Sequence, residues 1–238
     1  MSDLLDSAVA AHGGLDRWNQ ITSITFDASI TGAFWHIKGK GDALEDVRLE
    51  VETTRQRVTM DLAGHGKRYV YEPHRVVIGR ADGTIIDARD DPVRSFDGQQ
   101  FETLWDDVNL AYFVGEAQWT YLNMPFLYTW PGFVAEEIAP VEADGETWRR
   151  LKVTFPDHVT SHTRQQIACF GPDGLLRRHD FTFDVLGGVP GSLYAAGYRD
   201  VGGIVFPTTR RAFAEEGDTQ VVMVAIDMGE MTLRSPGR

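Results

Sequence analysis

Hydrophobic and polar residues alternate along most of this chain, the pattern of strands that bury one face. Glycine-containing turn pairs, among them Asp82-Gly83, Asp144-Gly145 and Asp173-Gly174, separate several of the alternating runs. The pattern predicts about ten strands joined mostly by tight turns, and therefore an antiparallel meander. Alternating runs lie at 24–30, 47–51, 58–62, 69–71, 76–78, 151–155, 181–185 and 220–231.

Helical spacing of apolar residues is found at the start of the chain and in its middle. Residues 2–12 predict an N-terminal helix that ends at Gly13-Gly14, and 15–21 predict a further short helical turn. The segment 106–123 predicts one long helix. Its apolar residues lie on more than one side, which is typical of a helix buried between two surfaces.

The long helix belongs to a wider segment, 92–133, that interrupts the strands. Directly after the helix come aromatic residues bounded by Pro125 and Pro131, which forbid a regular helix there. We expect this helical and aromatic segment to act as a lid on a sheet. With no linker or repeat in the sequence, we expect residues 1–238 to form a single domain.

Composition narrows the classes of function. A formal net charge of −12 argues against nucleic-acid binding, which needs clustered lysine and arginine. Arg210-Arg211 and the other adjacent arginine pairs are interpreted as solvated strand positions. Cys169 is the sole cysteine, and His158 and His162 lie among turn-forming residues, so we expect no metal site. Without a phosphate-binding loop, we expect no nucleotide or other cofactor either.

The sequence gives no sign of membrane insertion or export. No stretch approaches the roughly 20 apolar residues that a membrane-spanning helix requires. The first residues, MSDLLDSAVAAHGG, carry no positive region of the kind that begins a signal peptide. We therefore expect a cytoplasmic protein without a membrane span, whose oligomeric state the sequence does not indicate.

One histidine and several aromatic residues are candidates for a binding cavity. The strand pattern places His179 on the same face as Phe181 and Phe183. A histidine there is either a hydrogen-bonded core residue or a cavity-wall group that binds ligand or transfers a proton. Trp35 lies past the first strand and lines either a barrel mouth or the core. The other candidate ligand-binding residues, from the helical and aromatic segment, are Tyr112, Trp119, Phe126 and Trp130.

Four segments resemble the lipoprotein-carrier family that includes LolA- and LolB-like proteins. Near the start these are HGGLDRW and ITSITFDASITG, and later DGLLRRHDFTF and YRDVGGIVFPTTRRAF. The family pattern Tyr-x-Asp-x-x-Gly-x-x-x-Pro corresponds to Tyr198, Asp200, Gly203 and Pro207. The resemblance covers most of the chain in the order of its elements.

This resemblance implies an unclosed, strongly curved β-barrel, with helices on its concave side and an apolar cavity between. Carriers of this family work in the bacterial periplasm or are anchored through a lipidated N-terminal cysteine. Because this chain shows neither a signal peptide nor such a cysteine, we expect the fold to carry over and lipoprotein trafficking not to.

The sequence therefore predicts a protein that binds an apolar or aromatic small molecule in the cavity of a curved sheet. The alternative is a cofactor-independent enzyme on the same scaffold, with His179 and Glu116 in acid–base roles on a hydrophobic substrate. A weaker alternative is an interaction module that docks a partner through the aromatic segment. An enclosed cavity favours binding, a converging polar pair favours an enzyme, and an exposed aromatic patch favours a partner.

Overall fold

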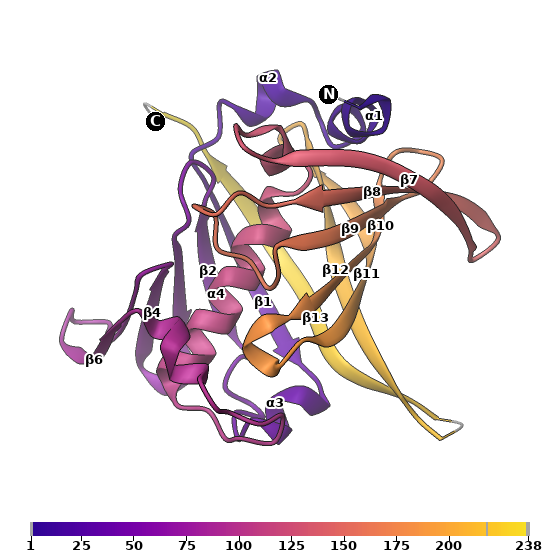
Figure 1. Ribbon diagram of the computed structural model, residues 1–238. Coiled ribbons are helices and arrows are strands. Elements are labelled where there is room, and N and C mark those ends of the chain that lie inside the picture. The colour runs from indigo at the N-terminus through magenta and orange to yellow at the C-terminus, as the bar shows by residue number, and fades with distance from the viewer. Residues whose placement is uncertain (1, 218, 237–238) are drawn as a thin grey trace.

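The computed structural model describes residues 2–217 and 219–236, and within them the strands form one open antiparallel sheet. Its thirteen strands follow the order β6-β5-β4-β3-β2-β1-β13-β12-β11-β10-β9-β8-β7. Figure 1 shows the sheet curving around the long helix α4 (Asp107–Asn123). The first strand pairs with the last, so β1 and β13 lie side by side in the middle of the sheet.

The strands divide into an N-terminal group and a C-terminal group on either side of that central pair. The first group is β1 (Ser23–Thr31), β2 (Val47–Glu52), β3 (Val58–Leu62), β4 (Lys67–Glu72), β5 (Arg75–Arg80) and β6 (Ile85–Asp90). The second is β7 (Val134–Ala143), β8 (Glu146–Thr154), β9 (Gln165–Phe170), β10 (Leu176–Phe183), β11 (Val189–Val201), β12 (Ile204–Glu216) and β13 (Thr219–Arg234).

The predicted curved antiparallel sheet is confirmed, but its strand count was too low: the sheet has thirteen strands and not about ten. Two of the strands without a clear signal, β6 and β7, are the edges of the sheet and have no fully buried residue. An edge strand that buries no face carries little apolar alternation, which explains why the pattern did not reveal them.

Besides α4, α-helices lie at the N-terminus and after β1, and short 3-10 helices lie in the connections. At the N-terminus, α1 (Asp3–Ala11) is capped by Ser2 and buries Leu4 and Leu5, and α2 (Leu15–Trp18) follows it. A short helix that was not predicted, α3 (Ala33–Ile37), follows β1 and contacts β13. Four 3-10 helices complete the described chain: η1 (Ala63–His65), η2 (Pro92–Phe96), η3 (Phe126–Thr129) and η4 (Asp184–Leu186).

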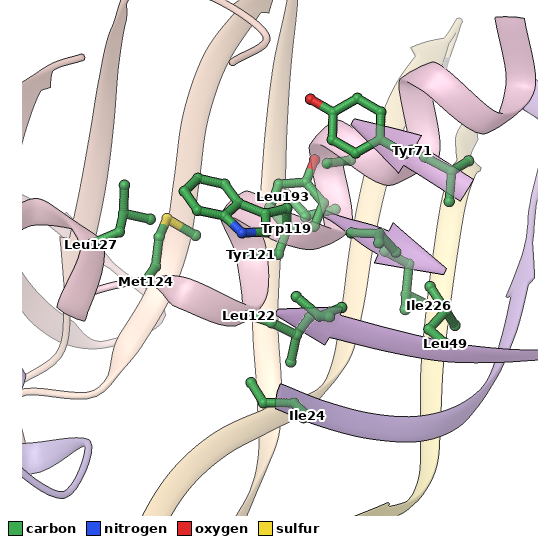
Figure 2. Packing of buried hydrophobic residues seen from close by; sticks show 14 of the residues in the cluster. Ile24, Leu49, Tyr71, Trp119, Tyr121, Leu122, Met124, Leu127, Leu193 and Ile226 are labelled. Atoms are coloured by element: carbon green, nitrogen blue, oxygen red, sulfur yellow. The ribbon is translucent and has the colours of Figure 1, made fainter. Parts of the chain in front are cut away.

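The helix α4 is the centre of the core. It begins at the Asp106 cap, whose carboxylate accepts a hydrogen bond from the Asn109 backbone at 2.7 Å. Residues Val108 to Asn123 are all buried, as its apolar residues on several sides predicted. Figure 2 shows core side chains that come from α4 and from β1, β2, β4, β11 and β13. Within the described residues, no helix combines the length and apolar character needed to cross a membrane.

One side of α4 packs directly on β2–β6. Gly115 permits this approach, because a Cβ atom there would lie only 2.3 Å from the Cβ atom of Tyr71 in β4. The inward side chains of β2 to β5 are almost fully buried beneath it. The helix and this part of the sheet therefore form a tightly packed layer.

Candidate functional site

The other side of α4 does not pack tightly against the sheet and leaves a cavity of about 160 Å³. Its walls come from α3, α4, η4 and the strands β10 to β13, together with the end of β1. On the helix, the lining residues are Phe113, Val114, Ala117, Gln118 and Tyr121. On the sheet they include Phe181, Phe183, Gly191, Leu193, Ala212, Phe213, Val224 and Ile226.

Small side chains explain why the space is open. Ala117 on the helix and Ala212 on the sheet occupy wall positions where a larger residue would fill the gap. The cavity reaches the surface beside Phe213, whose side chain lines it and is 37% exposed. Its size is comparable with that of an engineered protein cavity of about 150 Å³ that stays dry and binds benzene.

Polar side chains are few in the wall. The Tyr121 hydroxyl lies 3.3 Å from Nε2 of His162, and Ser192 donates a hydrogen bond to Asp180 at 2.7 Å. Gln118 is buried, and its Oε1 atom has no hydrogen-bond partner. Burial raises the pKa of Tyr121 above its usual range, so its hydroxyl stays neutral. The cavity wall is therefore predominantly apolar and uncharged.

Of the six candidate ligand-binding residues, Trp35 lies in the cavity wall, where its Nε1 atom donates to the Thr31 carbonyl at 3.1 Å. Tyr112 and Trp119 lie on the tightly packed side of α4. Tyr112 stands edge-on to Tyr71, and Trp119 donates to the backbone carbonyls of Glu52 and Arg55.

The aromatic segment after α4 lies beyond the C-terminal end of the helix. The Phe126 ring stacks on Trp18 of α2 with centroids 4.2 Å apart. The Trp130 ring stands edge-on to Trp119 and borders a shallow groove that also contains His158. Neither Phe126 nor Trp130 lines the cavity beside α4.

His179 lies behind the cavity wall and not in it. Its Nε2 atom is 2.6 Å from Oε1 of Gln166, and its ring contacts Tyr121 and Phe181, which do line the cavity. Burial, and next the nearby charge of Arg210, hold the pKa of His179 well below its usual range. The imidazole is therefore neutral near pH 7, in a hydrogen-bonded core position.

Glu116 and His162 meet at a second, more polar pocket of about 340 Å³ between α4, the loop before β9 and η4. The Glu116 Oε1 atom lies 3.1 Å from Nδ1 of His162, and both side chains are almost completely buried. The two atoms are close, but neither has an aligned hydrogen-bond partner. Through Nε2, His162 reaches Tyr121, so the three side chains connect the polar pocket with the apolar cavity.

No described cluster of three or more histidine, cysteine, aspartate or glutamate side chains is placed to hold a metal ion. His162 and His158 line different depressions, and the partner of His162 is Glu116.

Arg210 is a buried residue that the sequence reasoning assigned wrongly. It was interpreted as solvated, yet it is 1% exposed, while its neighbour Arg211 pairs with Asp227 outside. Alternation gave a usable signal, because the even positions Ile204 and Phe206 also face inward. One nitrogen, Nη2, donates to the Tyr121 carbonyl at 2.9 Å, while Nε and Nη1 have no partner.

Comparison with known proteins identifies the fold. No family model matches the chain, and no curated protein matches it. Among solved structures, a LolA superfamily protein from Nitrosomonas europaea has a TM-score of 0.54 at 10% identity, over 98% of this chain and 92% of that one. A Vibrio parahaemolyticus domain described as outer membrane lipoprotein-sorting has a TM-score of 0.56 at 8% identity, over 99% and 93%.

A DUF1329 family protein from Desulfovibrio piger is also similar, with a TM-score of 0.51 at 13% identity, covering 98% of this chain and 92% of that one. The chain therefore has the LolA-like fold, and the resemblance read from its sequence is confirmed. Identities this low establish the fold and leave function to be argued from the site.

The expectation of a cytoplasmic protein is wrong. The similar domain from Vibrio parahaemolyticus is described as outer membrane lipoprotein-sorting, which associates this fold with sites outside the cytoplasm. The cytoplasmic expectation rested on the first residues of the chain alone.

Proposed function

We propose that this protein binds an apolar small molecule, an acyl chain or an aromatic body, in the cavity between α4 and β10–β13. The observation that carries the proposal is the cavity itself, which is lined by apolar side chains and reaches the surface beside Phe213. The LolA-like fold supports it, since one similar structure is described as lipoprotein-sorting. Trp35 supplies an aromatic wall for the ligand.

Apolar burial sets how affinity depends on ligand size. Each methylene removed from water contributes about 0.8 kcal/mol, which corresponds to about a fourfold gain in affinity. In a series of neutral 1-alkanols, affinity should therefore rise by this factor per methylene and level off when the enclosed space is full. The neutral dye N-phenyl-1-naphthylamine, which fluoresces in apolar surroundings, reports binding through its displacement.

The matched variants are Ala117→Leu and Ala88→Leu. Ala117 lines the cavity, whereas Ala88 is exposed on β6 at the sheet edge, so only the first substitution puts carbon into the cavity. We expect Ala117→Leu to weaken octan-1-ol binding about tenfold and Ala88→Leu to leave it unchanged. Wild-type protein that neither brightens the dye nor binds any alkanol would rule out the proposal.

Acid–base catalysis without a cofactor is the second candidate, and the Glu116–His162 pair at the polar pocket favours it. A carboxylate beside an imidazole can take up and release a proton during hydrolysis of an acyl ester. Hydrolysis of p-nitrophenyl octanoate, followed by release of p-nitrophenolate, tests this. Turnover that is equal in wild type and in Glu116→Gln would exclude a role for the pair.

A further inference from the structure

Gln118 brings an amide group into the apolar wall of the cavity between α4 and β10–β13. The residue is 2% exposed, and its Oε1 atom has no hydrogen-bond partner in the part of the chain that the structure describes. Buried polar groups are nearly always hydrogen-bonded, because burial removes the water that would otherwise bind them. The amide therefore lacks a partner at a place where the neighbouring space can hold one.

Gln118 lies on the side of α4 that lines the cavity. Val114, four positions before it, and Tyr121, three positions after it, are its neighbours on that helix face and line the same cavity. Ala117 also lines it and is too small to fill the space. The terminal amide of a glutamine rotates about a soft torsion, so either its oxygen or its nitrogen can meet a ligand.

The other polar side chains of the described wall have partners of their own. Ser192 donates to a carboxylate of β10, Trp35 donates to a backbone carbonyl of β1, and the Tyr121 hydroxyl lies 3.3 Å from a histidine nitrogen. No charged side chain lines the wall within the described residues. A ligand therefore meets an apolar, uncharged surface in which the Gln118 amide still has an unused hydrogen-bond acceptor.

We propose that Gln118 is the specificity-determining residue of this cavity, and that the ligand is a neutral alcohol with an apolar body and one hydroxyl group. The inference deepens the proposed function, on which it rests. The hydroxyl donates a hydrogen bond to the Gln118 amide oxygen, and the apolar body occupies the space between α4 and β10–β13. A carboxylate suits this wall less well, because its charge would be buried without a counter-ion.

The test compares octan-1-ol with its isomer heptyl methyl ether, which contains the same atoms but has no hydrogen-bond donor. Both compete with the neutral dye at pH 7.5, and the dye affinity of each variant calibrates its competition curve. We expect wild-type protein to bind the alcohol about tenfold more tightly, since the ether leaves the amide oxygen without a partner. Octanoate, which is ionised at this pH, should bind more weakly than the alcohol. Tighter binding of octanoate would overturn the choice of a neutral hydroxyl.

Two variants assign the preference to Gln118. Gln118→Met keeps the length of the side chain and removes the amide, so the alcohol should lose its tenfold advantage over the ether. Thr120→Val is the matched control, because the Thr120 hydroxyl is also buried on α4 without a partner but does not line the cavity. Its preference for the alcohol should equal that of wild type.

Stability in the absence of ligand gives a second readout. Replacing an unpartnered buried amide by an apolar side chain of similar shape removes no hydrogen bond, so Gln118→Met should keep or raise the urea midpoint of unfolding. A lower midpoint with an unchanged preference for the alcohol would assign the amide a structural role and overturn the proposal.

The outcomes separate this inference from the function beneath it. If wild type binds the ether as tightly as the alcohol, the cavity binds apolar ligands and the role of Gln118 is refuted. If no ligand binds, the proposed function itself fails. Should Gln118→Met not fold, as judged by circular dichroism, Gln118→Asn replaces it. Asparagine is shorter by one methylene, so the preference should fall, and an unchanged preference would refute the role.

Discussion

The two sides of helix α4 face the same sheet and differ in how they are filled. Toward β2–β6, Gly115 lets the helix approach Tyr71, and the inward side chains of the strands are almost fully buried. Toward β10–β13, Ala117 faces Ala212 across open space. Both sides are apolar, so hydrophobicity does not distinguish core from cavity. The distinction lies in whether side-chain volume matches the separation of the two layers.

The two sides should therefore respond in opposite ways to added volume, and this gives the largest expected effect. Gly115→Ala places a methyl group against Tyr71 and should lower the free energy of unfolding by about 3 kcal/mol. Ala117→Leu, two residues away, adds more carbon but has a cavity to receive it, so its stability should change little. Urea unfolding of both variants measures this, and equal losses would show that the two sides are packed alike.

Acid should destabilise the half of the sheet that contains the cavity, because two buried histidines lie there. His12, whose ring contacts Phe170 of β9, has its pKa lowered by burial from 6.5 to about 4, and His179 of β10 is shifted in the same direction. Below pH 6.5 these histidines become protonated in the unfolded chain but stay neutral in the folded protein. The free energy of unfolding therefore falls as the pH falls toward 4.

The expected loss from His12 is about 2 kcal/mol at pH 5 relative to pH 7.5. Unfolding in urea at both pH values, on wild type and on His12→Gln/His179→Gln, measures the difference. The double variant should lose much of the pH dependence. His65→Gln, an exposed residue in η1, is the control and should keep it. If the free energy of unfolding of the double variant changed with pH as much as that of wild type, His12 and His179 would not be the source of the pH dependence.

Substitutions at Trp119 and Trp35 should have different effects, the first on stability and the second on ligand affinity. Trp119→Phe removes a donor to the carbonyls of Glu52 and Arg55 on the tightly packed side and should cost about 1–2 kcal/mol of stability. Its affinity for octan-1-ol should stay at the wild-type value. Trp35→Phe alters the cavity wall and should instead weaken octan-1-ol binding about threefold. The reverse pattern would place the ligand beside Trp119.

Periodicity predicted the antiparallel sheet, the long helix and the burial of that helix on two sides, because periodic patterns are visible in one sequence. The curvature of the sheet was implied by the resemblance to lipoprotein carriers. The sequence did not show that Tyr112 and Trp119 belong to the packed core whereas Trp35 lines the cavity, because the sequence pattern of an aromatic residue is the same in both places. A cavity forms where side chains of distant segments are too small to fill the space between them, as at Ala117 of α4 and Ala212 of β12. The alternation of apolar and polar residues carries no information on this.

Arg210 illustrates the same limit for charge. Its parity with Ile204 and Phe206 placed it inside, but the general preference of arginine for solvent outweighed that signal. The sequence named Glu116 as a candidate for acid–base chemistry, and the structure places it in the buried helix α4. Its partner His162 could not be found from the sequence, since the loop before β9 brings the two together only in the folded protein.

The smallest expected effect concerns the mouth of the cavity, where Phe213 and Val222 form a matched pair. They face each other across β12 and β13 and are similarly exposed, but only Phe213 lines the cavity. Replacing either residue by serine should change stability by less than about 0.5 kcal/mol, as is usual for exposed positions. Phe213→Ser should weaken octan-1-ol binding about twofold to threefold, since part of the ligand loses an apolar neighbour. Val222→Ser should leave affinity unchanged. If both variants bind as wild type does, ligand does not reach the surface at Phe213, and the enclosed part of the cavity holds all of it.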